Sequence, residues 1–204
     1  MNNSTHWENI YASKKAKEVS WYQELPLQSI EIINASKIDR KATIIDVGGG
    51  TSNLIAELLR NGFINITALD ISNNAIKKSQ FQLGSKSKHI NWINSNILTA
   101  NLPSKFFSFW HDRAVFHFLT DKNDRELYKL KIFEALRPKG FIAILAFAEN
   151  GPKKCSGLPV QRFSISTLKD EFANNFYLVC GNQHSHFTPA GNEQKFISCL
   201  FRMK

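Results

Sequence analysis

Residues 44–54 read IIDVGGGTSNL, an apolar strand pattern that runs into an acid, three glycines and the start of a helical pattern. A strand, a glycine-rich turn and a helix open many α/β domains, and the turn then lies at the carboxyl end of the strand, where ligands bind. Glycines let the backbone approach a ligand closely. We therefore expect Gly48, Gly49 and Gly50 to border a ligand site.

Strand and helix patterns alternate beyond this stretch. Expected strands cover 42–48, 64–72, 90–98 and 141–148, and the stretch 106–116 is expected to be a strand at least as far as Asp112. Expected helices lie at 52–62, 73–84 and 120–140. A short helix at 164–172 and two strands at 177–187 and 195–203 follow. This order predicts a doubly wound α/β sheet with helices on both faces and an antiparallel hairpin at its edge.

The length of 204 residues, 43% of them hydrophobic, fits one folded domain. We expect a helical extension or lid over 1–40, broken at Pro26, and a single domain over 41–204. No apolar run approaches the roughly 18 residues of a membrane span, and the N-terminus lacks the apolar region of a signal peptide. The three cysteines contain no CxxC pair, so we expect a cytoplasmic protein with reduced thiols and no membrane partner.

The net charge of +9 permits an acidic partner without naming one. The lysines fall into several short clusters rather than one long run. Such a distribution is more typical of a solvated surface than of a nucleic-acid groove. Nucleic acid is therefore not the expected partner, and no sequence feature indicates an oligomeric state.

Three kinds of ligand compete for the glycine-rich turn. A P-loop requires a Lys-Ser/Thr pair, which is absent here. A dinucleotide fingerprint requires a third glycine where Asn53 stands, although Asp70, at 70 − 50 = 20 residues after Gly50, suits a ribose. Asp46 would also repel a pyrophosphate.

S-adenosylmethionine (SAM) fits the same turn better. It carries an ammonium and a sulfonium and no phosphate, so the carboxylate of Asp46 is favourable beside it, and Asp70 still suits the ribose hydroxyls. A simpler reading is that Asp46 only accepts backbone N–H bonds from the loop. The charge of the ligand thus favours SAM over a dinucleotide.

With these residues in place, the chain from about residue 40 to its end resembles the class I SAM-dependent methyltransferases. DVGGGT resembles their first motif and ALDIS their second, and LRPKG resembles the turn before their fifth strand, with Lys139 replacing a glycine. The resemblance implies a Rossmann-like seven-stranded sheet of order 3-2-1-4-5-7-6 with an antiparallel strand 7. It also implies that the cofactor SAM becomes S-adenosylhomocysteine.

The resemblance implies a cofactor site as well. Asn96 stands where family members often carry an acid that bonds the adenine amino group, and an amide oxygen can accept the same bond. The expected cofactor-binding residues are Asp46, Gly48, Gly49, Gly50, Thr51, Asp70, Ile71, Asn96, Ile97 and Trp21.

His111 and Asp112 end the expected fourth strand, which in this family faces the methyl group. We expect Asp112 to position the acceptor and His111 to act as a base, with a packing contact to adenosine as the alternative for His111. The N-terminal HWENIY and EVSWYQ stretches resemble the elongation-factor lysine methyltransferase subgroup, whose first helices fold over the cofactor. That subgroup has D-K-G-T-x-D after strand four, and His117 replaces its last acid here.

The incomplete acid pair favours a small-molecule acceptor over a protein lysine. Motifs of nucleic-acid methyltransferases are absent after strand four. An inactive SAM-binding module and an NAD-dependent oxidoreductase are alternatives of other classes. Cys155, His184 and His186 fit core or sheet packing better than a reactive or metal site, and no metal is expected.

Overall fold

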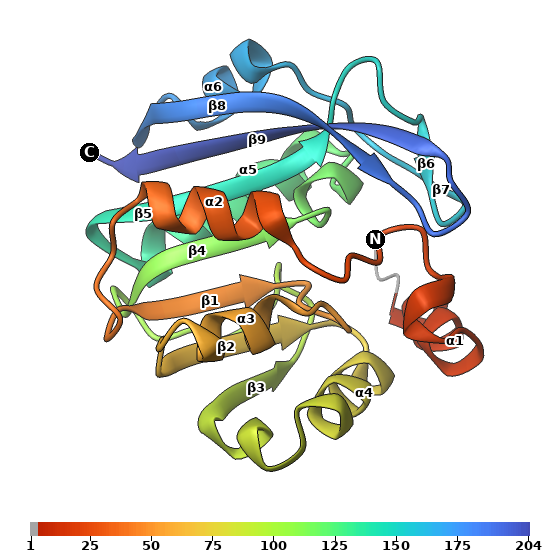
Figure 1. Cartoon of the computed structure of the whole chain (residues 1–204). Coiled ribbons are helices and arrows are strands. Elements are labelled where there is room, and N and C mark those ends of the chain that lie inside the picture. Colours follow the sequence, from red (N-terminus) through yellow and green to blue (C-terminus); the bar gives the residue numbers. More distant parts are fainter. Residues whose placement is uncertain (1–3) are drawn as a thin grey trace.

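The computed structural model describes residues 4–204, which form a seven-stranded sheet of order β3-β2-β1-β4-β5-β9-β8 (Figure 1). β1 to β4 pair in parallel with their neighbours, and β9 runs antiparallel to both β5 and β8. The predicted order is confirmed, because β9 and β8 take the places of strands 7 and 6. The strands are β1 (Thr43–Val47), β2 (Asn65–Asp70), β3 (Ile90–Asn94), β4 (Phe107–Arg113), β5 (Leu136–Phe147), β8 (Phe176–Phe187) and β9 (Glu193–Met203), with β6 (Lys154–Cys155) and β7 (Leu158–Pro159) in a separate hairpin.

Helices cover both faces of the sheet (Figure 1). Of the described helices, none is both long and apolar enough to cross a membrane. The helices are α1 (Ser4–Ser13), α2 (Leu27–Ala35), α3 (Leu54–Arg60), α4 (Asn73–Leu83), α5 (Lys122–Ala135) and α6 (Ile165–Phe172), with 3-10 turns η1 (Ala16–Glu18), η2 (Gly84–His89) and η3 (Phe116–Phe118).

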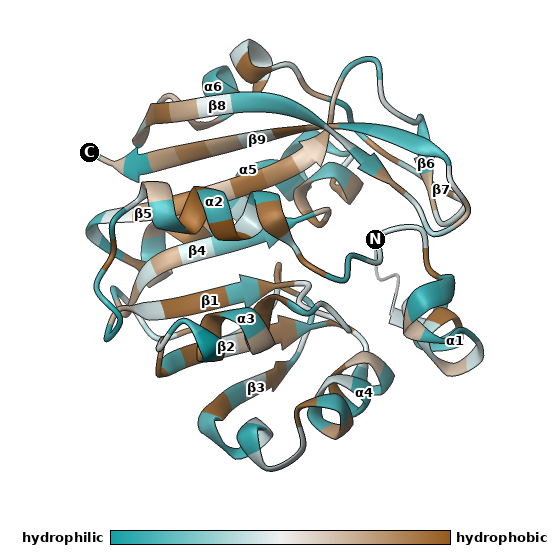
Figure 2. Ribbon diagram, viewed as in Figure 1, coloured by the Kyte–Doolittle hydropathy of each residue, from teal (hydrophilic) through white to brown (hydrophobic). Residues whose placement is uncertain are grey.

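The apolar strands explain this layering, because successive side chains of a strand point to opposite faces. Ile44 and Phe109 belong to one buried cluster with α2 and α3, whereas Ile45 and Trp110 belong to another with α5 and α6. Strands β5 and β9 are largely brown in Figure 2, whereas the edge strand β8 is largely hydrophilic. Near-continuous apolar strands are typical of a sheet buried on both faces.

The N-terminal region is only partly helical, whereas a helical extension broken at Pro26 was expected over 1–40, of which 1–3 lie outside the described residues. It contains α1, η1 and α2, and Pro26 is the N-cap of α2. Ile32 and Ile33 of α2 lie in the buried core, so α2 is part of the sheet packing. The segment before it, residues 4–26, is named the N-terminal segment below, and its helix α1 lies beyond the carboxyl ends of β1 and β2 (Figure 1).

The LRPKG stretch was expected to end a helix and form a turn, and that expectation is wrong. α5 ends at Ala135, and Leu136 already pairs with Phe107 as the first residue of β5. The pairing register then shifts between Phe107 and Phe109. Lys139 has a φ of 63°, so it adopts the left-handed conformation that glycine favours.

A buried polar chain links α5 to β4. Trp110 Nε1 donates a hydrogen bond to the Tyr128 hydroxyl at 3.0 Å, and that hydroxyl donates to Asp112 Oδ2. All three side chains are fully buried. The Tyr128 hydroxyl therefore satisfies a carboxylate that water does not reach.

Replacing Tyr128 with Phe should lower the free energy of unfolding by about 1–3 kcal/mol, because the Asp112 carboxylate loses a donor while it stays buried. Urea unfolding of the purified protein measures this change. Tyr177→Phe is the matched control, since Tyr177 is 46% exposed. A loss no larger than that of the control would contradict the role given to Tyr128.

Candidate functional site

The glycine-rich turn folds over the end of β2. The backbone N–H groups of Gly48 and Gly49 donate to Leu69 O at 2.7 and 3.3 Å. Gly48 has a φ of 69°, and a side-chain carbon there would lie 2.1 Å from Val115 Cγ2. Only glycine fits this position, so the backbone is brought to the edge of the cavity described next.

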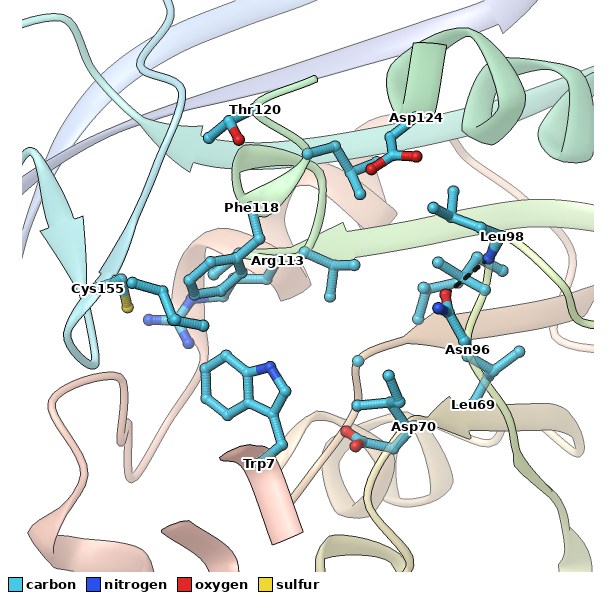
Figure 3. Close-up of a pocket in the computed structure, with 18 of the residues that line it drawn as sticks. Trp7, Leu69, Asp70, Asn96, Leu98, Arg113, Phe118, Thr120, Asp124 and Cys155 are labelled. Carbon is cyan, nitrogen blue, oxygen red and sulfur yellow. Dashed lines mark hydrogen bonds between the residues drawn. The ribbon is translucent and has the colours of Figure 1, made fainter. Parts of the chain in front are cut away.

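A cavity of about 410 Å³ opens at the carboxyl edge of the parallel strands. Its walls come from the strand ends, the N-terminal segment, the loop after β4 and the β6–β7 hairpin. The lining is mainly apolar with a few polar groups, and both this composition and the volume are typical of small-molecule sites. Figure 3 shows two ends: Asp70, Asn96 and Leu98 lie on one side, and Trp7, Arg113, Phe118 and Cys155 lie on the other.

Asp70 and Asn96 supply the polar groups of the first end. Asp70 Oδ1 accepts a hydrogen bond from Ser72 N at 2.8 Å, and Asn96 Oδ1 accepts one from Leu98 N at 3.0 Å. Each side chain thus keeps a further oxygen or nitrogen site for a ligand. Ile71 and Ile97, which are expected to contact the cofactor, line the cavity beside them.

Burial raises the pKa of the Asp70 carboxyl to about 7. Backbone N–H bonds from Ser72 and Gly50 act against this rise, and the negative charges of Asp46 and Glu8 add to it. The carboxylate therefore lacks sufficient donors in the protein alone. Hydroxyl groups of a ribose would supply such donors.

The remaining residues of the turn lie beneath the cavity or beside it. Gly48 lines the cavity, but Gly49, Gly50, Thr51 and Asp46 do not. A side-chain carbon at Gly50 would lie 2.5 Å from the Tyr11 hydroxyl, so the N-terminal segment packs directly on the turn. Trp21 lines the cavity from the same segment.

Asp46 belongs to a buried chain rather than to the cavity surface. Its Oδ1 lies 2.7 Å from His111 Nδ1, and His111 Nε2 lies 2.9 Å from Ser29 Oγ. Asp46 Oδ2 is buried and has no hydrogen-bond partner among residues 4–204. An unpaired carboxylate oxygen just below the turn suits a positively charged ligand group above it.

The position expected for His111, facing a methyl group, is therefore wrong. Both of its ring nitrogens contact buried partners, and it does not line the cavity. The reason is that β4 extends to Arg113, two residues beyond His111. Arg113, on the same face of the strand, therefore reaches the cavity in place of His111.

Asp112 also lies outside the cavity, on the α5 side of the sheet. It accepts hydrogen bonds from Val115 N at 2.9 Å and from Phe116 N at 3.0 Å, besides the Tyr128 bond. Burial raises its pKa to about 6, although these bonds oppose the rise. Asp112 thus fixes the turn after β4, and that turn places Val115 and Phe118 on the cavity wall.

The second end of the cavity combines aromatic rings with one cation. The Trp7 ring meets Phe118 edge-on at 5.2 Å and Trp21 at 5.7 Å between centroids. Arg113 and Cys155 complete this end (Figure 3). Sequence reading gave Arg113 no role, and the only signal for it was its position next to Asp112 at the strand end.

The N-terminal segment is anchored by Glu8. The Glu8 carboxylate accepts backbone hydrogen bonds from Asn73 at 2.7 Å and Asn74 at 3.0 Å, and a bond from Ser72 Oγ at 2.9 Å. It thereby caps the N-terminus of α4 and fixes α1 beside Asp70. Trp7, one residue earlier, is held over the cavity as a result.

Of the other residues considered from the sequence, the histidines contact protein groups, whereas Cys155 lines the cavity. His117 is fully buried, and its ring meets Phe118 edge-on and Phe147 at a tilt. His184 stacks on Phe196 and contacts Ser198 Oγ, and His186 Nε2 lies 2.7 Å from Ser20 O. Cys155 is buried but lines the cavity.

Comparisons with known proteins agree with this geometry. A family model described as a methyltransferase domain matches residues 45–144. EEF1A lysine methyltransferase 2 from Mus musculus is 26% identical over 187 residues, which cover 78% of this chain and 75% of that protein. Its counterpart from Danio rerio is 29% identical over 131 residues, which cover 61% of this chain and 56% of that protein.

A solved structure shares the fold. It is the 1,6-didemethyltoxoflavin-N1-methyltransferase of Burkholderia thailandensis, with bound 1,6-didemethyltoxoflavin and S-adenosylhomocysteine. The TM-score is 0.72 at 16% identity, and the match covers 99% of this chain and 84% of that chain. Together with the family match, these relatives support SAM as the cofactor, as the resemblance predicted.

Replacing Asp70 with Asn should weaken S-adenosylhomocysteine binding about 10- to 100-fold, because a neutral amide is a poorer acceptor for ribose hydroxyls. The same change should stabilise the ligand-free protein above pH 7, by about 1–3 kcal/mol. A raised carboxyl pKa favours folding at low pH, and this contribution is lost as the pH rises through about 7.

Calorimetric titration and melting curves between pH 5 and pH 8.5 measure the two effects. Asp170→Asn, at an exposed site, is the control. Unchanged affinity for S-adenosylhomocysteine would contradict the assignment of Asp70. A difference in melting temperature that does not grow with pH would contradict its raised pKa.

Proposed function

Sequence and fold together support a class I SAM-dependent methyltransferase similar to the EEF1A lysine methyltransferases, and from that premise we propose that the methyl acceptor is a small molecule. The observation that carries the proposal is the second end of the cavity, where aromatic side chains and Arg113 surround the space next to the cofactor site. An apolar, partly enclosed end that contains one cation suits a compact small-molecule acceptor better than it suits the ammonium group of a lysine.

The residues present fit the cofactor. Asp70 would hold the ribose hydroxyls, Asn96 the adenine, and the backbone at Gly48 would lie along the methionine part. The unpaired Asp46 Oδ2 lies below that part and favours its positive charge. When bound, SAM would supply a methyl group on a sulfonium, and an in-line nucleophile would take this methyl group with S-adenosylhomocysteine as the leaving group.

The chain contributes orientation and exclusion of water. Trp7, Trp21 and Phe118 cover the acceptor end, so that a bound acceptor lies close to the cofactor in an apolar space. Cys155 is the thiol at this end, and burial raises its pKa to about 11, although Arg113 opposes the rise. It stays protonated at neutral pH and does not act as a base.

This arrangement favours an acceptor that needs no strong base. The direct role expected for Asp112, positioning the acceptor at the methyl group, does not fit its place outside the cavity. We assign it instead the indirect role of fixing the turn that carries Val115 and Phe118. We drop the role of His111 as a base, since its nitrogens are engaged with Asp46 and Ser29.

A protein lysine is the second candidate, and the mouse and zebrafish relatives favour it by their names. A lysine ammonium must lose a proton before it can attack, and acids near the nucleophile assist this step. Asp112, which matches the first acid of the lysine enzymes, lies buried behind the wall of the cavity. The cation of Arg113 further disfavours an approaching ammonium.

Incubation of the purified protein with methyl-labelled SAM and a cell extract separates the two candidates. After separation of small molecules from protein by size, cation exchange removes unreacted labelled SAM from the small-molecule fraction. We expect label to remain in this fraction and none above background in protein. The variant Asp70→Ala defines the background. Label found only in protein, released as methyl-lysine on acid hydrolysis, would replace the small-molecule proposal with the lysine candidate.

A further inference from the structure

Arg113 presents an unmatched positive charge at the acceptor end of the cavity. Its Nη1 donates to Trp21 O at 3.0 Å. Its Nη2 is buried and has no hydrogen-bond partner among residues 4–204. A guanidinium carries five N–H donors in a planar fork, so a buried and unpaired nitrogen is an unfavourable state that a ligand can relieve.

The groups around Arg113 provide little opposite charge. Cys155 stays protonated, and burial together with the charge of Arg113 lowers the pKa of His117 to about 3 and of His184 to about 4. Asp46 is the carboxylate that acts on Arg113, but its Oδ1 is bonded to His111. Burial lowers the pKa of Arg113 to about 10, so the guanidinium remains charged at neutral pH.

The position of Arg113 separates it from the cofactor groups already assigned. In Figure 3, its side chain lies beside Cys155 and Phe118, across the cavity from Asp70 and Asn96. It is the last residue of β4, and its neighbour in the cavity wall is the aromatic group of Trp7, Trp21 and Phe118. Charge and apolar surface therefore lie side by side where the acceptor is expected.

We propose that the methyl acceptor carries an anionic oxygen group, such as a carboxylate, which Arg113 binds through Nη2 while the body of the acceptor packs on Trp7 and Phe118. This inference rests on the proposed function and narrows its substrate class. A planar guanidinium matches a carboxylate in geometry, and the low-polarity surroundings strengthen the pair.

The carboxylate of SAM itself is the alternative anionic partner for Arg113. If it pairs with Arg113, loss of the guanidinium weakens the cofactor rather than the acceptor. S-adenosylhomocysteine and 5′-methylthioadenosine separate the two cases, because only the first carries the carboxylate.

The experiment measures binding of three matched probes to the protein saturated with S-adenosylhomocysteine. The probes are benzoate, benzyl alcohol and benzylamine, which share a ring and differ in charge. Quenching of the cavity tryptophans Trp7 and Trp21 reports binding, with calorimetry as an independent readout. We expect benzoate to bind at least about tenfold more tightly than benzyl alcohol, and benzylamine to bind most weakly.

Variants of Arg113 test whether its guanidinium causes the preference for benzoate. Arg113→Met should abolish the preference for benzoate and leave the affinity for S-adenosylhomocysteine within about twofold, whereas Arg113→Lys should keep part of the preference. Melting curves verify that each variant folds. If Arg113→Met does not fold, the order of the three probes on the unaltered protein and on Arg113→Lys decides.

Two results would overturn the inference. One is an absence of benzoate preference in the unaltered protein, including no binding by any probe. The other is a loss of S-adenosylhomocysteine affinity in Arg113→Met with unchanged affinity for 5′-methylthioadenosine, which would assign Arg113 to the cofactor. Failure of the unaltered protein to bind S-adenosylhomocysteine at all would instead contradict the proposed function.

Discussion

The buried chain from Ser29 through His111 to Asp46 is the interaction on which the site depends. It crosses from helix α2 to strands β4 and β1, with distances of 2.9 and 2.7 Å. It fixes the Asp46 carboxylate directly below the glycine-rich turn, where the second oxygen is left unpaired. Removing one partner of such a buried polar pair leaves the other without compensation. The turn, and therefore the cavity, has its position because this chain holds β1 and β4 in place.

A buried carboxylate also fixes the turn after β4. The Asp112 carboxylate accepts two backbone N–H bonds and the hydroxyl of Tyr128, and so it fixes the residues that line the cavity. Two acids of neighbouring strands thus lie behind the cavity wall, Asp46 bonded to a side chain and Asp112 to the backbone. On the proposals above, ligand recognition falls to Asp70 at one end of the cavity and Arg113 at the other, both of which line it.

Strand and helix patterns predicted the parallel α/β sheet, and the family resemblance supplied its strand order. Asp70 and Asn96 were expected at the cavity because each lies at or just after the carboxyl end of a strand, and parallel strands bring these ends to one edge. The sequence patterns were not sufficient for β4. His111 and Arg113 share one face of the strand, but β4 runs on to Arg113, so His111 lies in the core and Arg113 at the cavity. Trp7 reaches the cavity through the Glu8 contacts with α4, which join segments distant in sequence and follow no local pattern.

Burial acts on the two charged ends of the cavity in opposite directions. It raises the pKa of Asp70 to about 7 and lowers that of Arg113 to about 10, so each group is partly deprived of the solvation that its charge requires. A ribose at Asp70 and, on the inference above, an anion at Arg113 each restore part of what burial removes. The ligand-free site therefore holds two unfavourable charges apart within one apolar cavity. A ligand of the wrong charge at either end would leave the cost of burying Asp70 or Arg113 uncompensated, and this cost is the source of the selectivity that we infer.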